Sequence, residues 1–171
     1  MKQNILLALF AAGMALLCAC GGEPEPAQPE SEGEPMEIAA FSFYHTASWT
    51  GDCYCLELKR EADGVHLYAE VLFSGGRIAD AAIPDDVLKQ VEELAGTYRV
   101  ERWDGFDKSS KHVMDGSSFE LYITLADGST LSARGNNKFP EGYSEVSSAI
   151  RTLYNELMEQ HGREVDEGGS A

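Results

Sequence analysis

Basic residues are scarce in this chain of 171 residues. Lysine and arginine total 13 against 29 aspartates and glutamates, so the formal net charge is −16 at pH 7. Such a charge repels the phosphates of nucleic acids and anionic lipid headgroups, and we expect no nucleic-acid partner. A cationic peptide, a basic protein face or a divalent cation is compatible with it. So is the simpler interpretation that the charge keeps the domain soluble.

The sequence also lacks the short motifs of several enzyme classes. It contains no Gly-x-Ser-x-Gly elbow, no Ser-x-x-Lys pair, no His-Glu-x-x-His zinc helix and no phosphate-binding glycine loop. We therefore assign no catalytic residue, no cofactor and no metal ligand. These absences favour a protein that is not an enzyme, without excluding one.

Cysteine is rare, and two of the four cysteines lie close together near the start of the chain. Residues 1–20, MKQNILLALFAAGMALLCAC, place one lysine before an apolar segment that runs from Ile5 to about Leu17. This segment is shorter than the ~20 apolar residues that a membrane-spanning helix needs. It is typical of a secretory signal peptide.

The end of this segment, Leu17-Cys18-Ala19-Cys20-Gly21, resembles the lipobox of bacterial lipoproteins. In a lipobox, leucine stands three positions before the modified cysteine and a small residue stands directly before it. Cys20 fits this pattern, whereas Cys18 would follow the bulky Leu17. The resemblance implies a signal peptide over 1–19, a lipid on Cys20, and anchoring to the outer face of a bacterial membrane, either the cell membrane or an outer membrane. A plain signal peptide or an uncleaved anchor is the alternative.

Large apolar residues are nearly absent from the segment that follows. Residues 20–37 include GGEPEPAQPESEGEPME, which holds four prolines and six glutamates and cannot form a core. We expect a flexible tether here, a single folded domain over 38–162, and a disordered tail over 163–171.

Two hairpins are predicted within the domain. In residues 53–73, CYCLELKREADGVHLYAEVLF, the pair Asp63-Gly64 is a strong turn signal. With these residues as the turn, apolar residues pair on one face: Leu58 with Ala69, Leu56 with Val71, and Tyr54 with Phe73. A four-residue loop shifts the pairing and keeps the same faces. A three-residue loop is excluded because it would set Glu70 opposite Leu56.

In the second hairpin, residues 119–135, FELYITLADGSTLSARG, favour a three-residue loop over 126–128 with Gly128 left-handed. This register pairs Ile123 with Leu131, Leu121 with Ala133, Phe119 with Gly135, Glu120 with Arg134, and Thr124 with Thr130. We expect the sheet core to contain Tyr54, Leu56, Leu58, Val71, Phe73, Phe119, Leu121, Ile123, Leu131 and Ala133.

Two helices are predicted from apolar spacing. The first lies within 83–96, with Pro84 in its first turn and Gly96 at its end. The second lies within 140–162, with His161 in its last turn. Further strands are expected at 38–45, 77–82 and 98–102. Together these elements predict an α+β fold, an antiparallel sheet built from hairpins with two helices packed on one face.

From residue 103 onward the chain resembles a family of uncharacterised bacterial lipoproteins. The matching features are the loop Trp-Asp-Gly-Phe-Asp at 103–107, the pair Asp115-Gly116, and the ARGNNKFP run at 133–140. The resemblance implies a fold and a surface location and no activity. The cysteine pair at 53 and 55 departs from the family pattern.

Cys53 and Cys55 are the two thiols outside the leader region. In a strand they would share a face opposite Tyr54, with Cα atoms ~6.5 Å apart, near the upper limit for a disulfide. Three interpretations are open: the two thiols form a strained redox-active disulfide, they belong to a metal site, or they are simply two small residues under a loop. We expect no disulfide between them. His45 and His66 could reach the same sheet, but no zinc-type spacing is present.

The segment 103–115 is the other candidate site, an interaction loop formed by Trp103, Asp104, Phe106 and Asp107. Its acidic residues do not follow the EF-hand pattern. The structural interpretation is that the two aromatic residues cap the core while the aspartates accept hydrogen bonds from turn amides.

These observations predict a lipid-anchored extracytoplasmic binding or interaction domain, monomeric, in contact with the membrane only through its lipid. Its partner would be a protein, a peptide or the cell wall. The alternative is a small extracytoplasmic enzyme or redox protein that uses Cys53 and Cys55 or the 104–115 loop. An enzyme should gather titratable groups in a pocket, whereas a binding domain should present an exposed aromatic patch.

Overall fold

The computed structural model describes residues 36–47, 50–72, 76–110 and 116–165. Along these residues the elements are β1 (Ile38–Ala47), β2 (Tyr54–Glu61), β3 (Gly64–Val71), β4 (Arg77–Ile83), α1 (Asp86–Thr97), the 3₁₀ helix η1 (Val100–Trp103), β5 (Phe106–Ser109), β6 (Ser117–Leu125), β7 (Thr130–Asn136), α2 (Tyr143–His161) and β8 (Arg163–Glu164).

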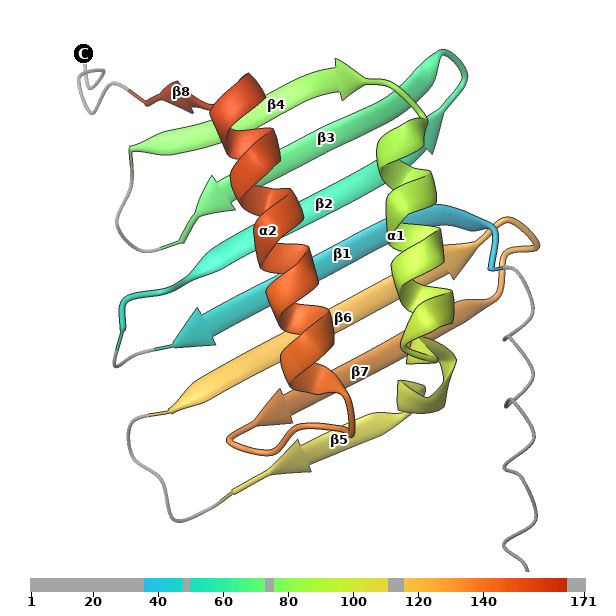
Figure 1. The fold of residues 1–171 in the computed structure, drawn as a ribbon, viewed down its shortest axis with the longest axis vertical. Coiled ribbons are helices and arrows are strands. Elements are labelled where there is room, and N and C mark those ends of the chain that lie inside the picture. Colours follow the sequence, from blue (N-terminus) through green and yellow to red (C-terminus); the bar gives the residue numbers. More distant parts are fainter. Residues whose placement is uncertain (1–35, 48–49, 73–75, 111–115, 166–171) are drawn as a thin grey trace, which may run out of the picture. The chain divides into compact units, whose positions relative to one another are not determined.

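The strands form one sheet in the order β5-β7-β6-β1-β2-β3-β4-β8, in which only the β5–β7 pair is parallel. β1 lies in the middle, where it joins the β2–β3 hairpin to the β6–β7 hairpin. The segment containing α1 connects β4 to β5 at the opposite edge of the sheet. α2 then connects β7 to β8, which pairs with β4. Both helices cross in front of the strands in Figure 1. The prediction of an α+β fold with a mostly antiparallel sheet is confirmed.

The first hairpin adopts the shifted register, with Tyr54 opposite Val71 and Leu58 opposite Leu67. The pairing that used Asp63-Gly64 as the turn is therefore wrong, although the assignment of faces is correct. Gly64 is already in β3, opposite Glu61, and a Cβ there would lie 3.1 Å from the Ile83 carbonyl oxygen. This glycine allows two strands to approach closely.

The second hairpin has the predicted register throughout. Gly128 has a φ of +85°, and the Leu125 N–H donates to the Ser129 carbonyl at 2.8 Å across the three-residue loop. The Asp127 carboxylate accepts a hydrogen bond from the Ser129 N–H at 2.8 Å. The turn residues and the apolar alternation favour the same register, so the prediction is confirmed.

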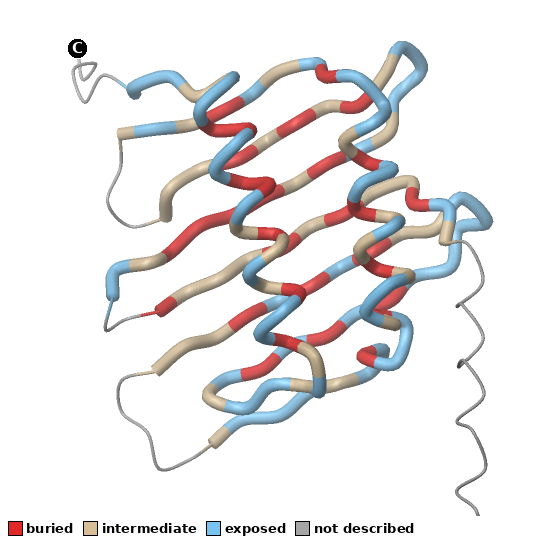
Figure 2. Tube along the Cα trace, viewed as in Figure 1, coloured by how far each residue is buried: buried red, intermediate tan, exposed pale blue. Residues whose placement is uncertain are grey.

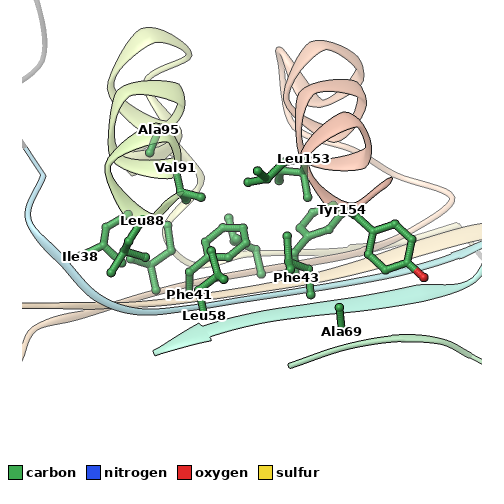
Figure 3. Close-up of a cluster of buried hydrophobic side chains, with 14 of the residues drawn as sticks. Ile38, Phe41, Phe43, Leu58, Ala69, Leu88, Val91, Ala95, Leu153 and Tyr154 are labelled. Carbon is green, nitrogen blue, oxygen red and sulfur yellow. The ribbon is translucent and has the colours of Figure 1, made fainter. Parts of the chain in front are cut away.

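The core is one cluster of buried apolar residues that come from the strands and from both helices. Buried residues alternate with more exposed ones along the strands in Figure 2. Of the residues expected in the core, those that the structure describes are buried except Val71, which is half-buried, and Phe73 lies outside the described residues. Figure 3 shows Leu88 and Val91 of α1, with Leu153 and Tyr154 of α2, gathered around Phe41 and Phe43 of β1.

The helix boundaries differ slightly from the predictions. α1 begins at Asp86, so Pro84 precedes it, and it continues through Gly96 to Thr97. α2 ends at His161 as expected. Within the described part of the chain, no helix has both the length and the apolar character needed to cross a membrane.

In three short segments the secondary structure differs from the prediction made from the sequence. The strand expected at 98–102 is wrong: Arg99 has a φ of +53°, and Val100–Trp103 form a 3₁₀ helix that buries its first and last residues. β5 lies inside the candidate interaction loop, and β8 comprises the first two residues of the expected tail.

Candidate functional site

Six polar residues on neighbouring strands form the surface that we call the Tyr/Glu face: Tyr44, Glu57, Tyr68, Glu70, Glu120 and Tyr122. Each alternates along its strand with buried core residues, because successive side chains of a strand point to opposite faces. Tyr122 is 46% exposed, and Glu120 is also exposed.

The register of the sheet brings these residues together from distant parts of the sequence. One row of laterally paired residues runs Glu120, Tyr44, Cys55, Glu70, and the next runs Tyr122, Ser42, Glu57, Tyr68, Asp80. Because β1 separates the two hairpins, its pairing with both β2 and β6 creates these rows.

Each tyrosine of the face donates a hydrogen bond to a glutamate. The Tyr44 hydroxyl donates to Glu57. The Tyr68 hydroxyl donates to Glu70 at 2.8 Å, and the Tyr122 hydroxyl to Glu120 at 3.1 Å. These bonds raise the pKa of Tyr68 to about 12 and raise the pKa values of Tyr44 and Tyr122 as well. The tyrosines are therefore neutral donors at physiological pH.

The face carries more acidic than basic groups. His66 lies 2.9 Å from Asp80, and Arg134 lies 2.6 Å from Asp107. These contacts occupy two carboxylates at the sides of the face. Glu57, Glu70 and Glu120 instead accept hydrogen bonds from tyrosines, which do not neutralise their charge. The surface thus combines carboxylates with aromatic rings.

Cys55 lies within the face, and its side chain is buried. Its Sγ is 3.7 Å from the Glu57 carboxylate, and both Cys55 and Cys53 are free thiols. Burial, followed by the negative charges of Glu57 and Glu70, raises the pKa of Cys55 to about 12. Because the thiolate is the nucleophile, this environment favours the inert form of the residue.

The residues of the predicted interaction loop lie at the β5–β7 edge. Trp103 is only 3% exposed, and its Nε1–H donates to the Glu141 carbonyl at 3.0 Å. Asp104 accepts a hydrogen bond from the Ser132 N–H at 3.0 Å. This geometry matches the structural interpretation of the loop, in which Trp103 covers the core and Asp104 satisfies a backbone amide.

Phe106 and Asp107 connect this loop to the Tyr/Glu face. Phe106 is half-buried against the core. Asp107 is exposed, and its pKa is lowered mainly by the hydrogen bond from Arg134. A shallow cavity of about 300 Å³ has Asp107, Tyr122 and Arg134 in its wall, so this end of the loop borders the face.

His45 and His66 lie on opposite faces of the sheet. The His45 Nδ1 is 3.1 Å from the Tyr143 hydroxyl on the core side, and burial lowers the pKa of His45. His66 pairs with Asp80 on the other face. The two imidazoles cannot share one ligand, and no cluster of three or more metal-binding side chains occurs in the described ranges.

The Tyr/Glu face was not predicted from the sequence. Two of its pairs have a simple signature, Tyr68-x-Glu70 and Glu120-x-Tyr122, in which the partners are two residues apart on the solvent side of a strand. The third pair, Tyr44 with Glu57, spans two strands and depends on the β1–β2 register.

The predicted lipidation site, Cys20, lies outside the described residues. No protein-family model matches the chain, and no curated protein matches it.

Proposed function

We propose that this protein is a monomeric binding domain, held at the outer face of a bacterial membrane by a lipid on Cys20, whose Tyr/Glu face binds a cationic partner. The partner would be a peptide, a basic protein face or a cell-wall component that carries amines. The observation that carries the proposal is the set of three Tyr–Glu pairs on one surface.

The anchor is supported by the lipobox-like Leu17-Cys18-Ala19-Cys20 and by the Pro/Glu-rich segment that follows. The diacylglyceryl and N-acyl chains of a bacterial lipoprotein provide at least two hydrocarbon tails, enough for stable attachment. The family of uncharacterised lipoproteins that the segment from residue 103 resembles would share this location.

We further infer that α1 and α2 both pack against the buried face of the sheet and leave the Tyr/Glu face open. Leu88 of α1 and Tyr154 of α2 belong to one cluster with Phe41 and Phe43, whose side chains alternate with those of Ser42 and Tyr44. A partner could then reach the face without displacing a helix.

A cationic partner fits the chemistry of this surface. Lysine and arginine form charge-assisted hydrogen bonds with carboxylates and make cation–π contacts with tyrosine rings. Glu57, Glu70 and Glu120 provide the first interaction, and the neighbouring tyrosines provide the second. The overall charge of −16 would attract such a partner and repel nucleic acids.

The alternative of a redox protein or thiol enzyme is less well supported. Cys55 is buried, its pKa is raised to about 12, and acidic residues surround it. Reactive cysteines instead occur in electropositive and partly exposed environments.

Charge removal tests the binding surface. In one variant, Glu57, Glu70 and Glu120 become glutamine. In a matched control, the exposed helix residues Glu93, Glu145 and Glu156 become glutamine, which changes the net charge equally. We expect the first variant to bind a lysine-rich peptide roughly tenfold more weakly, because three partly exposed ion pairs are lost. The control should lose much less affinity in the same calorimetric titration. Equal losses would show that net charge, and not this face, governs binding.

The anchor has its own test. Cys20→Ser should release the protein from membranes or block its processing, because the acylated thiol is lost, whereas Cys18→Ser should leave it membrane-bound. Fractionation of cells followed by immunoblotting measures both. The same behaviour in the two variants would contradict the lipobox assignment.

A further inference from the structure

A cleft of about 580 Å³ lies between α2 and the starts of β2 and β4, separate from the Tyr/Glu face. Among its lining residues are Asp52, Tyr54, Arg77, Arg151 and Tyr154. No member of the Tyr/Glu face contributes to the lining. The volume is in the range of small-molecule sites.

Arg151 is held in position at the wall of this cleft. Its guanidinium forms an ion pair with Asp52 and lies 4.6 Å from the ring centre of Tyr54 and 5.5 Å from that of Tyr154. Stacking on aromatic rings restricts the plane of the guanidinium. Since the group has five N–H donors, its contacts with Asp52 and Tyr54 use only part of its capacity.

Tyr154 has a hydroxyl whose hydrogen-bonding capacity is not used. The residue is 4% exposed, and within the described part of the chain its buried Oη has no hydrogen-bond partner. Such groups are uncommon because a buried hydroxyl without a partner is costly. Burial raises the pKa of Tyr154, so the hydroxyl keeps its proton and can donate.

Arg77 provides the second cation of the cleft. Its Nη2 donates to the Met158 carbonyl at 2.9 Å near the end of α2, and its Nε lies 3.6 Å from Glu164. The charges of Arg77 and Arg151 both lower the pKa of Tyr154, against the larger effect of burial. The positive charges of two arginines therefore both influence the Tyr154 hydroxyl. Such a pair is notable because the chain has few basic residues.

We propose that this cleft binds the anionic oxygen group, a carboxylate or a phosphate, of a small organic molecule. Arg151 and Arg77 supply the positive charge and the Tyr154 hydroxyl a neutral donor. Asp52 already forms an ion pair with Arg151, so the anionic group of the ligand would share this guanidinium with Asp52. Val71 and Met158 give the cleft an apolar wall for the remainder of the ligand.

The test is a titration of the full-length chain with benzoate and, separately, with inorganic phosphate, followed by NMR of the arginine Nε–Hε groups. We expect saturable shifts at Arg151 and Arg77 with at least one probe. Binding of benzoate alone would identify an organic carboxylate, and binding of phosphate alone a phosphate group. If neither probe shifts these signals saturably, the proposal is overturned.

Tyr154→Phe separates binding from stability. Because the hydroxyl has no partner in the described structure, this change should leave the melting temperature equal or higher. It should still weaken binding of the active probe by about tenfold or more, the loss expected for one hydrogen bond to a charged group. Arg151→Gln should weaken binding roughly tenfold or more. Arg134→Gln, an exposed arginine paired with one aspartate on the other face, is the matched control and should bind normally. Unchanged affinity in both cleft variants would contradict the proposal.

Discussion

Leu121 and Tyr122 are adjacent in β6 but belong to opposite faces of the sheet. Leu121 is fully buried against Phe43 and Ala133 of the neighbouring strands, whereas Tyr122 is 46% exposed and donates to Glu120. The same alternation separates Tyr54 from Cys55 and Phe43 from Tyr44. One face therefore stabilises the fold through apolar contacts, and the other is available to carry charge and aromatic rings at a surface.

The largest expected difference between the faces is in stability. Leu121→Ala should lower the free energy of unfolding by ~2–5 kcal/mol, because it removes buried methyl groups and leaves a cavity. Urea denaturation followed by tryptophan fluorescence measures the change. A loss below about 0.5 kcal/mol, the usual limit for surface substitutions, would mean that this position is not in the core.

Much of the buried face could be predicted from the sequence. In the β6–β7 hairpin, the loop Ala126-Asp127-Gly128 and the apolar alternation favour the same register, and the structure has that register. In the β2–β3 hairpin two registers preserve the same faces, so the alternation could not choose between them. The pair Asp63-Gly64 favoured the wrong register. Gly64 is not a turn residue but lies in β3, where the lack of a side chain allows the close approach of the Ile83 carbonyl.

The Tyr/Glu face and the sheet edges could not be predicted in the same way. The face requires β1 to lie between β2 and β6, and the pairing of β1 with β6 joins residues far apart in sequence. β5 is a four-residue strand that pairs in parallel with β7, and β8 has two residues. Such short elements carry too few residues to show an alternation.

A further expected effect is a pH dependence of stability that belongs to Cys55 on the Tyr/Glu face. The pKa of this thiol is about 12 in the folded protein, above its ordinary value of 9.0, so the unfolded chain loses the proton first as the pH rises. The contribution to stability is complete below pH 9 and is lost as the pH rises toward 12. Cys55→Ala should therefore reduce the fall in unfolding free energy above pH 9. Parallel urea titrations of both proteins measure this, and identical pH profiles would contradict it.

The smallest expected effect on stability belongs to Tyr122→Phe. The substitution keeps the ring and removes only the exposed hydrogen bond to Glu120, so the unfolding free energy should change by less than about 0.5 kcal/mol. Placed beside Leu121→Ala in one denaturation series, it compares the two faces at adjacent positions. A loss as large as that of Leu121→Ala would show that the Tyr/Glu face is part of the structural core.

An amide NMR titration with a lysine-rich peptide shows whether the Tyr/Glu face is the binding surface. We predict chemical-shift changes concentrated at Tyr44, Glu57, Tyr68, Glu70, Glu120 and Tyr122 and at their neighbours in β1, β2, β3 and β6. The changes should decrease as salt is added, because the interaction is between partly exposed charges. Changes concentrated on the exposed sides of α1 and α2, or the absence of saturable changes on these four strands, would contradict the account.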